Sequence, residues 1–399
     1  MKKILFPAFM ALAVLLLSGC GARQDKLKVA MSLTEDEWKV MREKVIPAFE
    51  KKEKIAVEAV QVEASDLPQL LEAMDRAGSM QIDLFAQDNM QLALLTSKNL
   101  VEDLSTYEKM IPRSVPRALV SNLRTGDRLY FMPYRPNVQI TYYNKAKFDK
   151  YGLKPPRNWD ELLAVAKKFK QKEKTGKVLF QAWGGSPTAT QLYEWIVSAG
   201  GDPFKFNDRG CVRTFIFLQK LWPYLSPDSR KARFETANEY LERDSAYLSQ
   251  NWSSGFSQFV KNKEKSYIKT YSGFRGPRRY AHVIGGEVLG IPKGTCKTQQ
   301  ALLFIKHLQS KEIQEIFVSE LGWLSIRTDA YSQADPRMKP HYGSVMKAMQ
   351  SGVLRRNSAN WGEYEKLINE AFVKIAVRGE PVRPTLNEYA KKMAEHIKN

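Results

Sequence analysis

The stretch Leu27-Lys28-Val29-Ala30-Met31 is a short, mostly apolar run typical of a buried strand. Thr34-Glu35-Asp36-Glu37 follows it with the pattern of a capping box, so we predict that a helix begins there. The alternation continues with a predicted strand at 55–62, a helix at 67–77 and a strand at 82–85. This β-α-β-α-β order indicates an α/β fold with a mainly parallel sheet and flanking helices.

The residues upstream of this stretch have the three parts of an export signal. Met1-Lys2-Lys3 is positive, residues 4–17 carry no charge, and Leu17-Ser18-Gly19-Cys20 ends the segment. An apolar run of about 14 residues is too short to span a bilayer as a helix, which takes about 20. The last four residues resemble a lipobox, which implies a signal peptide at 1–19, lipid on Cys20 and a tether at 20–26. The alternative is an ordinary secretory signal with a chance cysteine.

Composition and charge limit the class of protein further. A chain of 399 residues is too long for one typical core, so we expect two domains. The formal charge of +19 is spread over helix faces such as 167–172, which argues against a nucleic-acid-binding tail and favours attraction to an anionic bilayer. An anionic ligand is the alternative explanation of the positive charge. Export permits a disulfide, but Cys211 and Cys296 are far apart in sequence, and we expect two unpaired thiols.

The rest of the chain continues the mixture of strands and helices. We predict strands at 138–143 and 288–291, a helix that starts near Asn158, helices at 299–309 and 313–321, and a mostly helical last sixty residues. Glycine and proline mark two places where we expect the chain to cross between domains, 132–137 and 284–287, and we expect a third crossing near 326–331.

Two passages carry a family resemblance. The first runs from Met132-Pro133-Tyr134 through Tyr142-Tyr143-Asn144-Lys145 and Pro155-Pro156 to Asn158-Trp159-Asp160-Glu161-Leu162. The second is Gly285-Gly286-Glu287-Val288-Leu289-Gly290-Ile291-Pro292-Lys293-Gly294. With Phe49-Glu50-Lys51-Lys52 near the start, they resemble bacterial extracellular solute-binding proteins of family 1, which include maltose-binding proteins.

The resemblance implies a two-lobed, type II periplasmic-binding-protein-like fold with a hinge between lobes. The lobes are expected at 27–134 with 288–328 and at 135–287 with 329–399. It also implies a substrate-binding lipoprotein that captures a mono- or oligosaccharide outside the cytoplasm and delivers it to an ABC permease. Such a protein is expected to be a monomer without cofactor or metal, held at the membrane by the lipid on Cys20.

Candidate ligand contacts follow from the expected interlobe position of the site. Asp88 matches an aspartate of the maltose-binding relatives, and Trp252 matches an aromatic platform. Asn137 occupies the position of an acidic sugar ligand in those relatives, and its amide in place of a carboxylate argues for a different ligand. The structural alternatives are a helix cap at Thr34, a hinge requirement at the two glycines and a helix anchor at Trp361. The complete set is Thr34, Glu35, Gln87, Asp88, Arg135, Asn137, Trp183, Trp252, Tyr271, Gly285, Gly286 and Trp361.

The alternatives to sugar binding are an enzyme and a receptor for another class of solute. An enzyme needs a positioned nucleophile or metal, and the four histidines lie in no motif of either kind. A phosphorylated or otherwise anionic solute would suit Arg135, Arg275 and Arg355. A polyamine site needs several carboxylates, which fits poorly with the positive charge of the chain.

Overall fold

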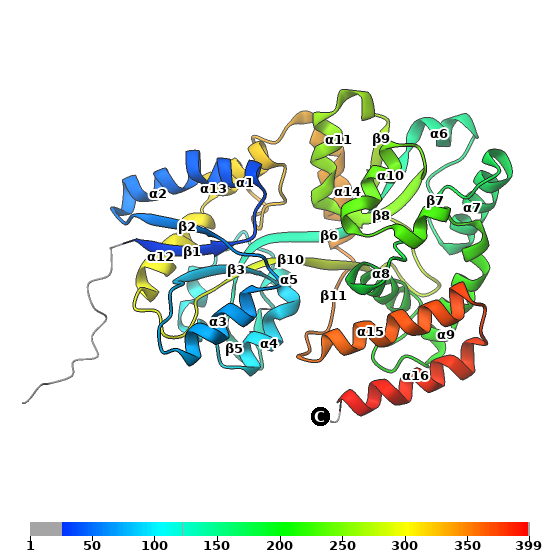
Figure 1. The fold of residues 1–399 in the computed structure, drawn as a ribbon. Coiled ribbons are helices and arrows are strands. Elements are labelled where there is room, and N and C mark those ends of the chain that lie inside the picture. The colour runs from blue at the N-terminus through cyan, green and yellow to red at the C-terminus, as the bar shows by residue number, and fades with distance from the viewer. Residues whose placement is uncertain (1–25, 122, 398–399) are drawn as a thin grey trace, which may run out of the picture.

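The computed structural model describes residues 26–121 and 123–397, which form two lobes side by side (Figure 1). Cys20 and the rest of the expected signal peptide lie outside the described residues. Within the described ranges, no helix is long and apolar enough to cross a membrane.

One nine-stranded sheet runs through both lobes in the order β2-β1-β3-β10-β6-β8-β7, with β11 beside β10 and β9 beside β6. The strands are β1 (Leu27–Met31), β2 (Val57–Gln61), β3 (Leu84–Asp88), β6 (Met132–Asn144), β7 (Val178–Leu179), β8 (Leu248–Trp252), β9 (Ile268–Tyr271), β10 (His282–Gly290) and β11 (Gly352–Leu354). A separate hairpin joins β4 (Arg124–Thr125) and β5 (Arg128–Leu129). Parallel pairs (β1 with β2 and β3, β7 with β8, β10 with β11) join antiparallel ones, so the sheet is mixed, as expected.

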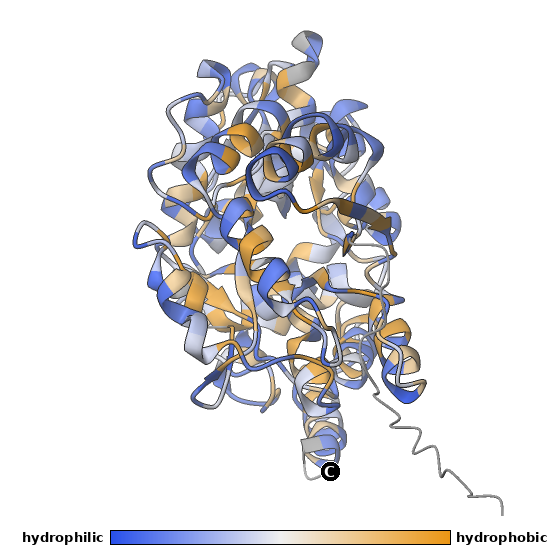
Figure 2. Ribbon diagram, turned by 90° about the vertical axis from the view of Figure 1, so that its left-hand side faces the viewer, coloured by the Kyte–Doolittle hydropathy of each residue, from blue (hydrophilic) through white to orange (hydrophobic). Residues whose placement is uncertain are grey.

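Helices cover both faces of the sheet, with hydrophilic residues along the outer helices (Figure 2). Before the first crossing they are α1 (Glu35–Val40), α2 (Ile46–Glu53), α3 (Leu67–Arg76), α4 (Leu92–Ser97) and α5 (Arg117–Ser121). Between the crossings they are α6 (Lys145–Lys150), α7 (Trp159–Glu173), α8 (Gly185–Ser198), α9 (Arg209–Leu221), α10 (Phe234–Glu242) and α11 (Ser257–Lys261). The last are α12 (Thr298–Leu308), α13 (Lys311–Ile316), α14 (Lys339–Met349), α15 (Trp361–Phe372) and α16 (Val382–Ile397).

Two long strands join the lobes. β6 pairs with β10 from Met132 to Val138, then with β8 and β9 from Gln139 onwards. The chain therefore crosses between lobes inside continuous strands, at the two places where glycine and proline were noted in the sequence.

Each lobe has its own apolar core. Phe49, Phe85 and Phe304 belong to a buried cluster around β1, β3 and α12, whereas Phe169 and Trp195 belong to another around α7, α8 and α9. A third cluster lies around β6, α10 and α14. Burying such a side chain stabilises the fold by about 1.5–3 kcal/mol relative to leaving it exposed.

Local sequence signals account for most of the predicted elements. Thr34 caps α1 in a capping box with Glu37, and Asn158 caps α7. The strand predicted at 288–291 is the end of β10, which begins earlier, at His282. Cys211 is a free, buried thiol as expected, but Cys296 is not free, so the expectation of two unpaired thiols is wrong at Cys296.

Candidate interlobe site

The ends of several strands meet at the crossing between the lobes. β1 and β3 run from the outer edge of their lobe towards β6 and β10, and Asp88 ends β3 (Figure 1). In the other lobe Trp252 ends β8 beside Gln139 of β6. The carboxyl ends of parallel strands are where α/β proteins commonly bind ligands, so the crossing is the candidate site.

Arg135 on β6 is held by two carboxylates. Its guanidinium donates to Oε1 of Glu37 at 2.8 Å and to Oε1 of Glu287 at 3.1 Å, and it lies 4.4 Å above the ring of Trp323. Burial lowers the pKa of Arg135, but Glu287 and Glu37 outweigh this and raise it overall. The Trp323 indole also donates to Glu37 at 3.0 Å. Four side chains therefore form one network: Glu37, Arg135, Glu287 and Trp323.

Glu287 is the least satisfied member of that network. Burial raises the pKa of its carboxyl group, and Arg135 opposes the rise. Oxygen Oε2 of Glu287 is buried and has no hydrogen-bond partner. A buried acceptor without a donor is costly, so a hydroxyl or amine that reached this oxygen would stabilise it.

Trp252 lies across the backbone of β10 at Gly285. A Cβ on Gly285 would come within 2.6 Å of the Trp252 indole, so only glycine leaves room for the ring. Gly286 has φ of +124°, and a Cβ there would meet the Arg135 carbonyl oxygen at 2.2 Å. The two glycines therefore serve different needs, a ring contact and a close strand crossing.

Arg355, which follows β11, lies between two indole rings. Its guanidinium carbon is 5.8 Å from the ring centroids of both Trp252 and Trp361. The side chain is buried and donates to the Thr190 hydroxyl at 2.8 Å, and its Nε has no partner. Burial lowers the pKa of Arg355, partly offset by Asp88 of the other lobe.

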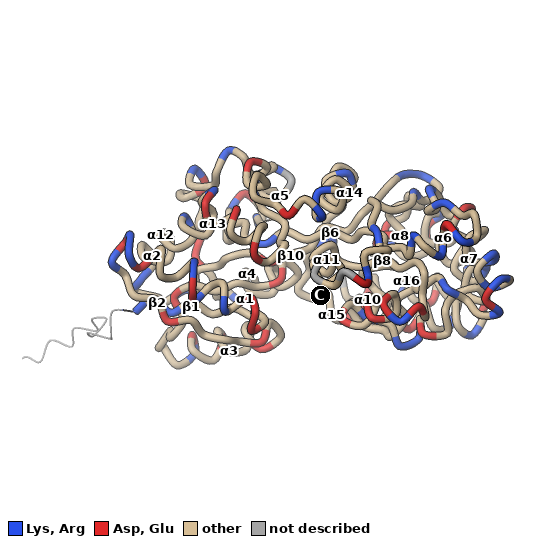
Figure 3. Tube along the Cα trace, turned by 90° about the horizontal axis from the view of Figure 1, so that it is seen from above, with Lys and Arg blue, Asp and Glu red and all other residues tan. Residues whose placement is uncertain are grey.

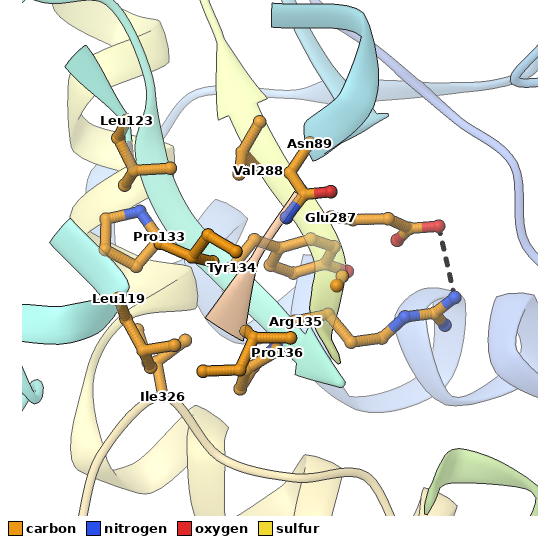
Figure 4. Close-up of a pocket in the computed structure, with 14 residues that line it drawn as sticks. Asn89, Leu119, Leu123, Pro133, Tyr134, Arg135, Pro136, Glu287, Val288 and Ile326 are labelled. Carbon is orange, nitrogen blue, oxygen red and sulfur yellow. Dashed lines mark hydrogen bonds and ion pairs between the residues drawn. The ribbon is translucent and has the colours of Figure 1, made fainter. Parts of the chain in front are cut away.

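A small cavity of about 30 Å³ also adjoins the crossing strands. Leu119, Leu123, Pro133 and Ile326 form an apolar wall, and Asn89 and Glu287 lie on the other side of the view (Figure 4). The Arg135–Glu287 contact is drawn at its edge. Its volume is far below the about 300–1,000 Å³ of typical ligand pockets, so the cavity suits packing at a hinge better than it suits binding of a solute.

The structure brings only part of the predicted set together. Asp88, Arg135, Trp252, Gly285, Gly286 and Trp361 lie at the crossing, where Asn137 also lies but uses its amide within the fold. It donates to the Ser254 hydroxyl at 3.0 Å and accepts from the Ser253 hydroxyl at 2.7 Å.

The other predicted residues have structural partners or lie apart. Thr34 caps α1, Glu35 pairs with Arg42 at 2.9 Å, and the Gln87 amide donates to the Ala64 carbonyl at 2.8 Å. Tyr271 donates to the Pro156 carbonyl at 3.0 Å, away from the crossing. Trp183, just before α8, is 61% exposed, and the Arg233 guanidinium lies 5.7 Å from its ring.

Two residues of the site, Glu37 and Glu287, were not among the predicted contacts, and Arg355 was predicted only for the alternative of an anionic solute. Glu287 could have been predicted from the sequence, because alternate residues of a strand point to the same face and Glu287 lies two residues after the candidate Gly285. No local pattern distinguishes Arg355 from Arg356 in the sequence. We call the set Glu37, Arg135, Glu287, Trp252, Arg355 and Trp361 the interlobe site.

Comparison with known proteins agrees with this geometry. The family model for bacterial extracellular solute-binding proteins matches residues 44–343. The chain belongs to this family. A probable ABC transporter-binding protein of Deinococcus radiodurans is 23% identical over 68% of this chain and 70% of its own length.

Similarity also extends to another curated protein and to a solved structure. The multiple sugar-binding protein of Streptococcus mutans is 25% identical over 44% of this chain and 42% of its own length. The maltose-bound MalE3 of T. maritima has the same fold, with a TM-score of 0.79 and 21% identity over 92% of this chain and 99% of that one. The predicted two-lobed fold and family are therefore confirmed.

Proposed function

We propose that this solute-binding protein is the receptor of an ABC importer and captures a carbohydrate between its lobes for delivery to a membrane permease. The observation that carries the proposal is the interlobe site itself. It combines two indole rings with buried polar groups that lack partners. The names of the sugar-binding relatives support the same solute class.

The chemistry of the interlobe site suits a sugar. The C–H faces of a pyranose pack on flat aromatic rings, and Trp252 presents such a ring beside the crossing strands. Sugar hydroxyls both donate and accept, so they can satisfy Oε2 of Glu287 and Nε of Arg355. An apolar solute would leave both groups unsatisfied, at a cost of about 1–3 kcal/mol each.

Capture is proposed to proceed by hinge bending of two lobes, residues 27–134 with 288–328 and residues 135–287 with 329–399. Besides the crossing strands, Asn357 connects the lobes. It donates to the Asn89 carbonyl at 2.9 Å and accepts from the Ala93 amide at 3.0 Å. A solute that contacts both lobes would favour one arrangement over the other, and the permease would detect that arrangement.

The same proposal includes an anchor at Cys20 and a non-catalytic role. Lipid at Cys20 would keep the receptor close to its permease outside the cytoplasm, and Cys20→Ser should release the protein while solute binding survives. Incubation of the purified protein with oligosaccharides should leave them uncut. Hydrolysis that is lost together with the interlobe side chains would refute the receptor role.

A sugar panel tests the proposed function directly. Binding should raise the melting temperature of the full-length protein, because a ligand that binds only the folded state stabilises it. Trp252→Ala should weaken binding about tenfold or more. Trp222→Ala is the matched control, because this tryptophan packs on Phe372 away from the crossing. The proposal fails if no carbohydrate of the panel binds, or if both variants weaken binding equally.

A further inference from the structure

Arg355 is a buried cation without an ionic partner. The residue is 4% exposed, and its guanidinium donates to the neutral Thr190 hydroxyl at 2.8 Å. Nε has no acceptor. Within the part of the chain that the structure describes, no carboxylate forms an ion pair with this guanidinium, in contrast to Arg135, which has two.

The nearest acids are engaged elsewhere. Asp88 and Glu365 both influence Arg355 electrostatically. However, Oδ1 of Asp88 accepts from the Met90 amide at 2.8 Å, and Oε2 of Glu365 accepts from the Trp361 indole at 3.0 Å. Burying an arginine without a close anion is costly, and the two indole rings offset only part of the cost. An incoming anion would remove the remainder.

The position of Arg355 is fixed by its neighbours. The Tyr193 hydroxyl donates to the Leu354 carbonyl at 3.1 Å and accepts from the Arg356 amide at 3.1 Å. The backbone on both sides of Arg355 is therefore held on α8. A guanidinium held in this way needs little reordering to bind an anion, which preserves affinity.

We propose that Arg355 binds an anionic substituent of the solute, so that the ligand is a sugar or polyol that carries a phosphate or carboxylate group. The inference rests on the proposed function and narrows its substrate class. A guanidinium between two indole rings offers planar donors to phosphate or carboxylate oxygens. The unpaired Oε2 of Glu287 accepts from a hydroxyl, so the solute presents its anionic end to Arg355 and a hydroxyl to Glu287.

The first test uses inorganic phosphate as the probe. At constant ionic strength, replacing chloride by phosphate should raise the melting temperature of the full-length protein, and Arg355→Met should abolish the rise. Arg356→Met is the control, because Arg356 is exposed and should leave the rise intact. If phosphate has no effect beyond that of chloride, or acts equally on both variants, the anion subsite is refuted.

The second test uses matched solutes in calorimetry. Glucose, glucose 6-phosphate and glucuronate form one set, and glycerol with glycerol 3-phosphate forms another. A charged member should bind about tenfold tighter than its neutral partner, and Arg355→Met should abolish that preference. The phosphate and carboxylate arms show which anion is preferred. Arg355→Lys keeps the positive charge but loses the planar guanidinium, so this variant should retain part of the preference for charged solutes.

The outcomes separate this inference from the proposed function. Tight binding of neutral sugars without preference for charged ones leaves the carbohydrate receptor standing and refutes the role of Arg355. Phosphate binding that depends on Arg355 while every sugar and polyol fails supports the subsite and refutes the carbohydrate receptor. If Arg355→Met weakens neutral and charged solutes equally, Arg355 only positions the two indole rings, and the inference is wrong.

Discussion

At Gly285 a single hydrogen atom in place of a side chain determines where Trp252 can lie. The indole occupies the space that a Cβ would need, at 2.6 Å from the ideal Cβ position. We predict that Gly285→Ala displaces the ring and costs about 1–3 kcal/mol of unfolding free energy, because the surroundings are already packed. Urea denaturation measures the loss, and solute binding should weaken with it.

Gly343 on α14 provides the matched control for that substitution. A Cβ at Gly343 meets nothing within 4 Å, so Gly343→Ala should leave solute binding unchanged and raise stability by about 0.5–1 kcal/mol through helix propensity. Equal effects of the two substitutions would show that the Trp252 contact at Gly285 is unimportant.

The two interlobe arginines should respond differently to the same change. Arg135→Met leaves the Glu37 and Glu287 carboxylates without their shared cation, at a cost of about 3 kcal/mol in unfolding free energy. Arg355→Met removes an unpaired buried charge and should be close to neutral in the absence of solute. Thermal and urea denaturation of both variants measure the contrast.

An exposed ion pair gives a reference value for these changes in unfolding free energy. Arg42 pairs with Glu35 at the surface, and Arg42→Met should change stability by less than about 1 kcal/mol. A loss for Arg135→Met that is no larger than this would contradict the network described for Arg135.

At the scale of elements, a buried glutamate of α8 forms a hydrogen bond with the backbone of β10. Glu194 on α8 accepts from the Val283 amide of β10 at 2.8 Å, and burial raises its pKa from 4.5 to about 8. His282, whose Nδ1 lies 3.8 Å from Glu194, has its pKa lowered by burial from 6.5 to about 4. Both groups are therefore neutral in the folded protein near pH 6.

This pair predicts a broad stability plateau between about pH 4.5 and 6.5 and a decline above it. Between pH 4.5 and 8 folded Glu194 keeps a proton that the unfolded chain releases, which lowers the unfolding free energy as pH rises. Below pH 6.5 the unfolded chain binds a proton at His282 that the folded state does not bind until about pH 4, and this opposite effect offsets the Glu194 effect down to about pH 4.5. Between pH 6.5 and 7.5 the Glu194 effect should approach about 1.4 kcal/mol per pH unit.

Glu194→Gln tests the assignment of the alkaline decline. The amide can still accept from Val283 and carries no titrating proton, so unfolding free energy should become nearly flat between pH 6.5 and 8. Glu235→Gln, at an exposed position of α10, should keep the decline. An unchanged slope in Glu194→Gln would assign the decline to another group.

The same elements show what local sequence signals can and cannot predict. The cap at Asn158 and the apolar run at Leu27–Met31 depend on neighbouring residues, and both were predicted near their observed positions. The first half of β10 was missed because His282–Gly286 contains a histidine and two glycines. It is a strand because β6, β11 and Glu194 satisfy its backbone, and these partners are distant in sequence.

At the scale of the whole molecule, the site depends on contacts between lobes. Trp252 and Gly285 were predicted because they match family positions and lie next to strand ends. Glu37 lies 98 residues from Arg135, and Thr190 lies 165 residues from Arg355, so no local pattern reveals either contact. Arg355 stands out because it is buried without an ionic partner, and this can be seen only in the folded structure.

The net charge of the molecule leads to the last prediction. The chain has 62 Lys and Arg against 43 Asp and Glu, and the basic residues are spread over both lobes (Figure 3). A Cys20→Ser protein should therefore still adhere to vesicles of anionic lipid at low salt, through a diffuse attraction that adds to the proposed lipid anchor.

Salt and lipid charge separate that attraction from other modes of binding. The Debye length falls from about 10 Å at 0.1 M salt to about 3 Å at 1 M, so adhesion of Cys20→Ser protein should disappear over this range in a vesicle sedimentation assay. Vesicles of neutral lipid should not bind it at either salt concentration. Because the attraction is diffuse, Arg356→Met alone should change adhesion little. Adhesion that survives high salt would instead indicate an apolar membrane-binding surface on the lobes.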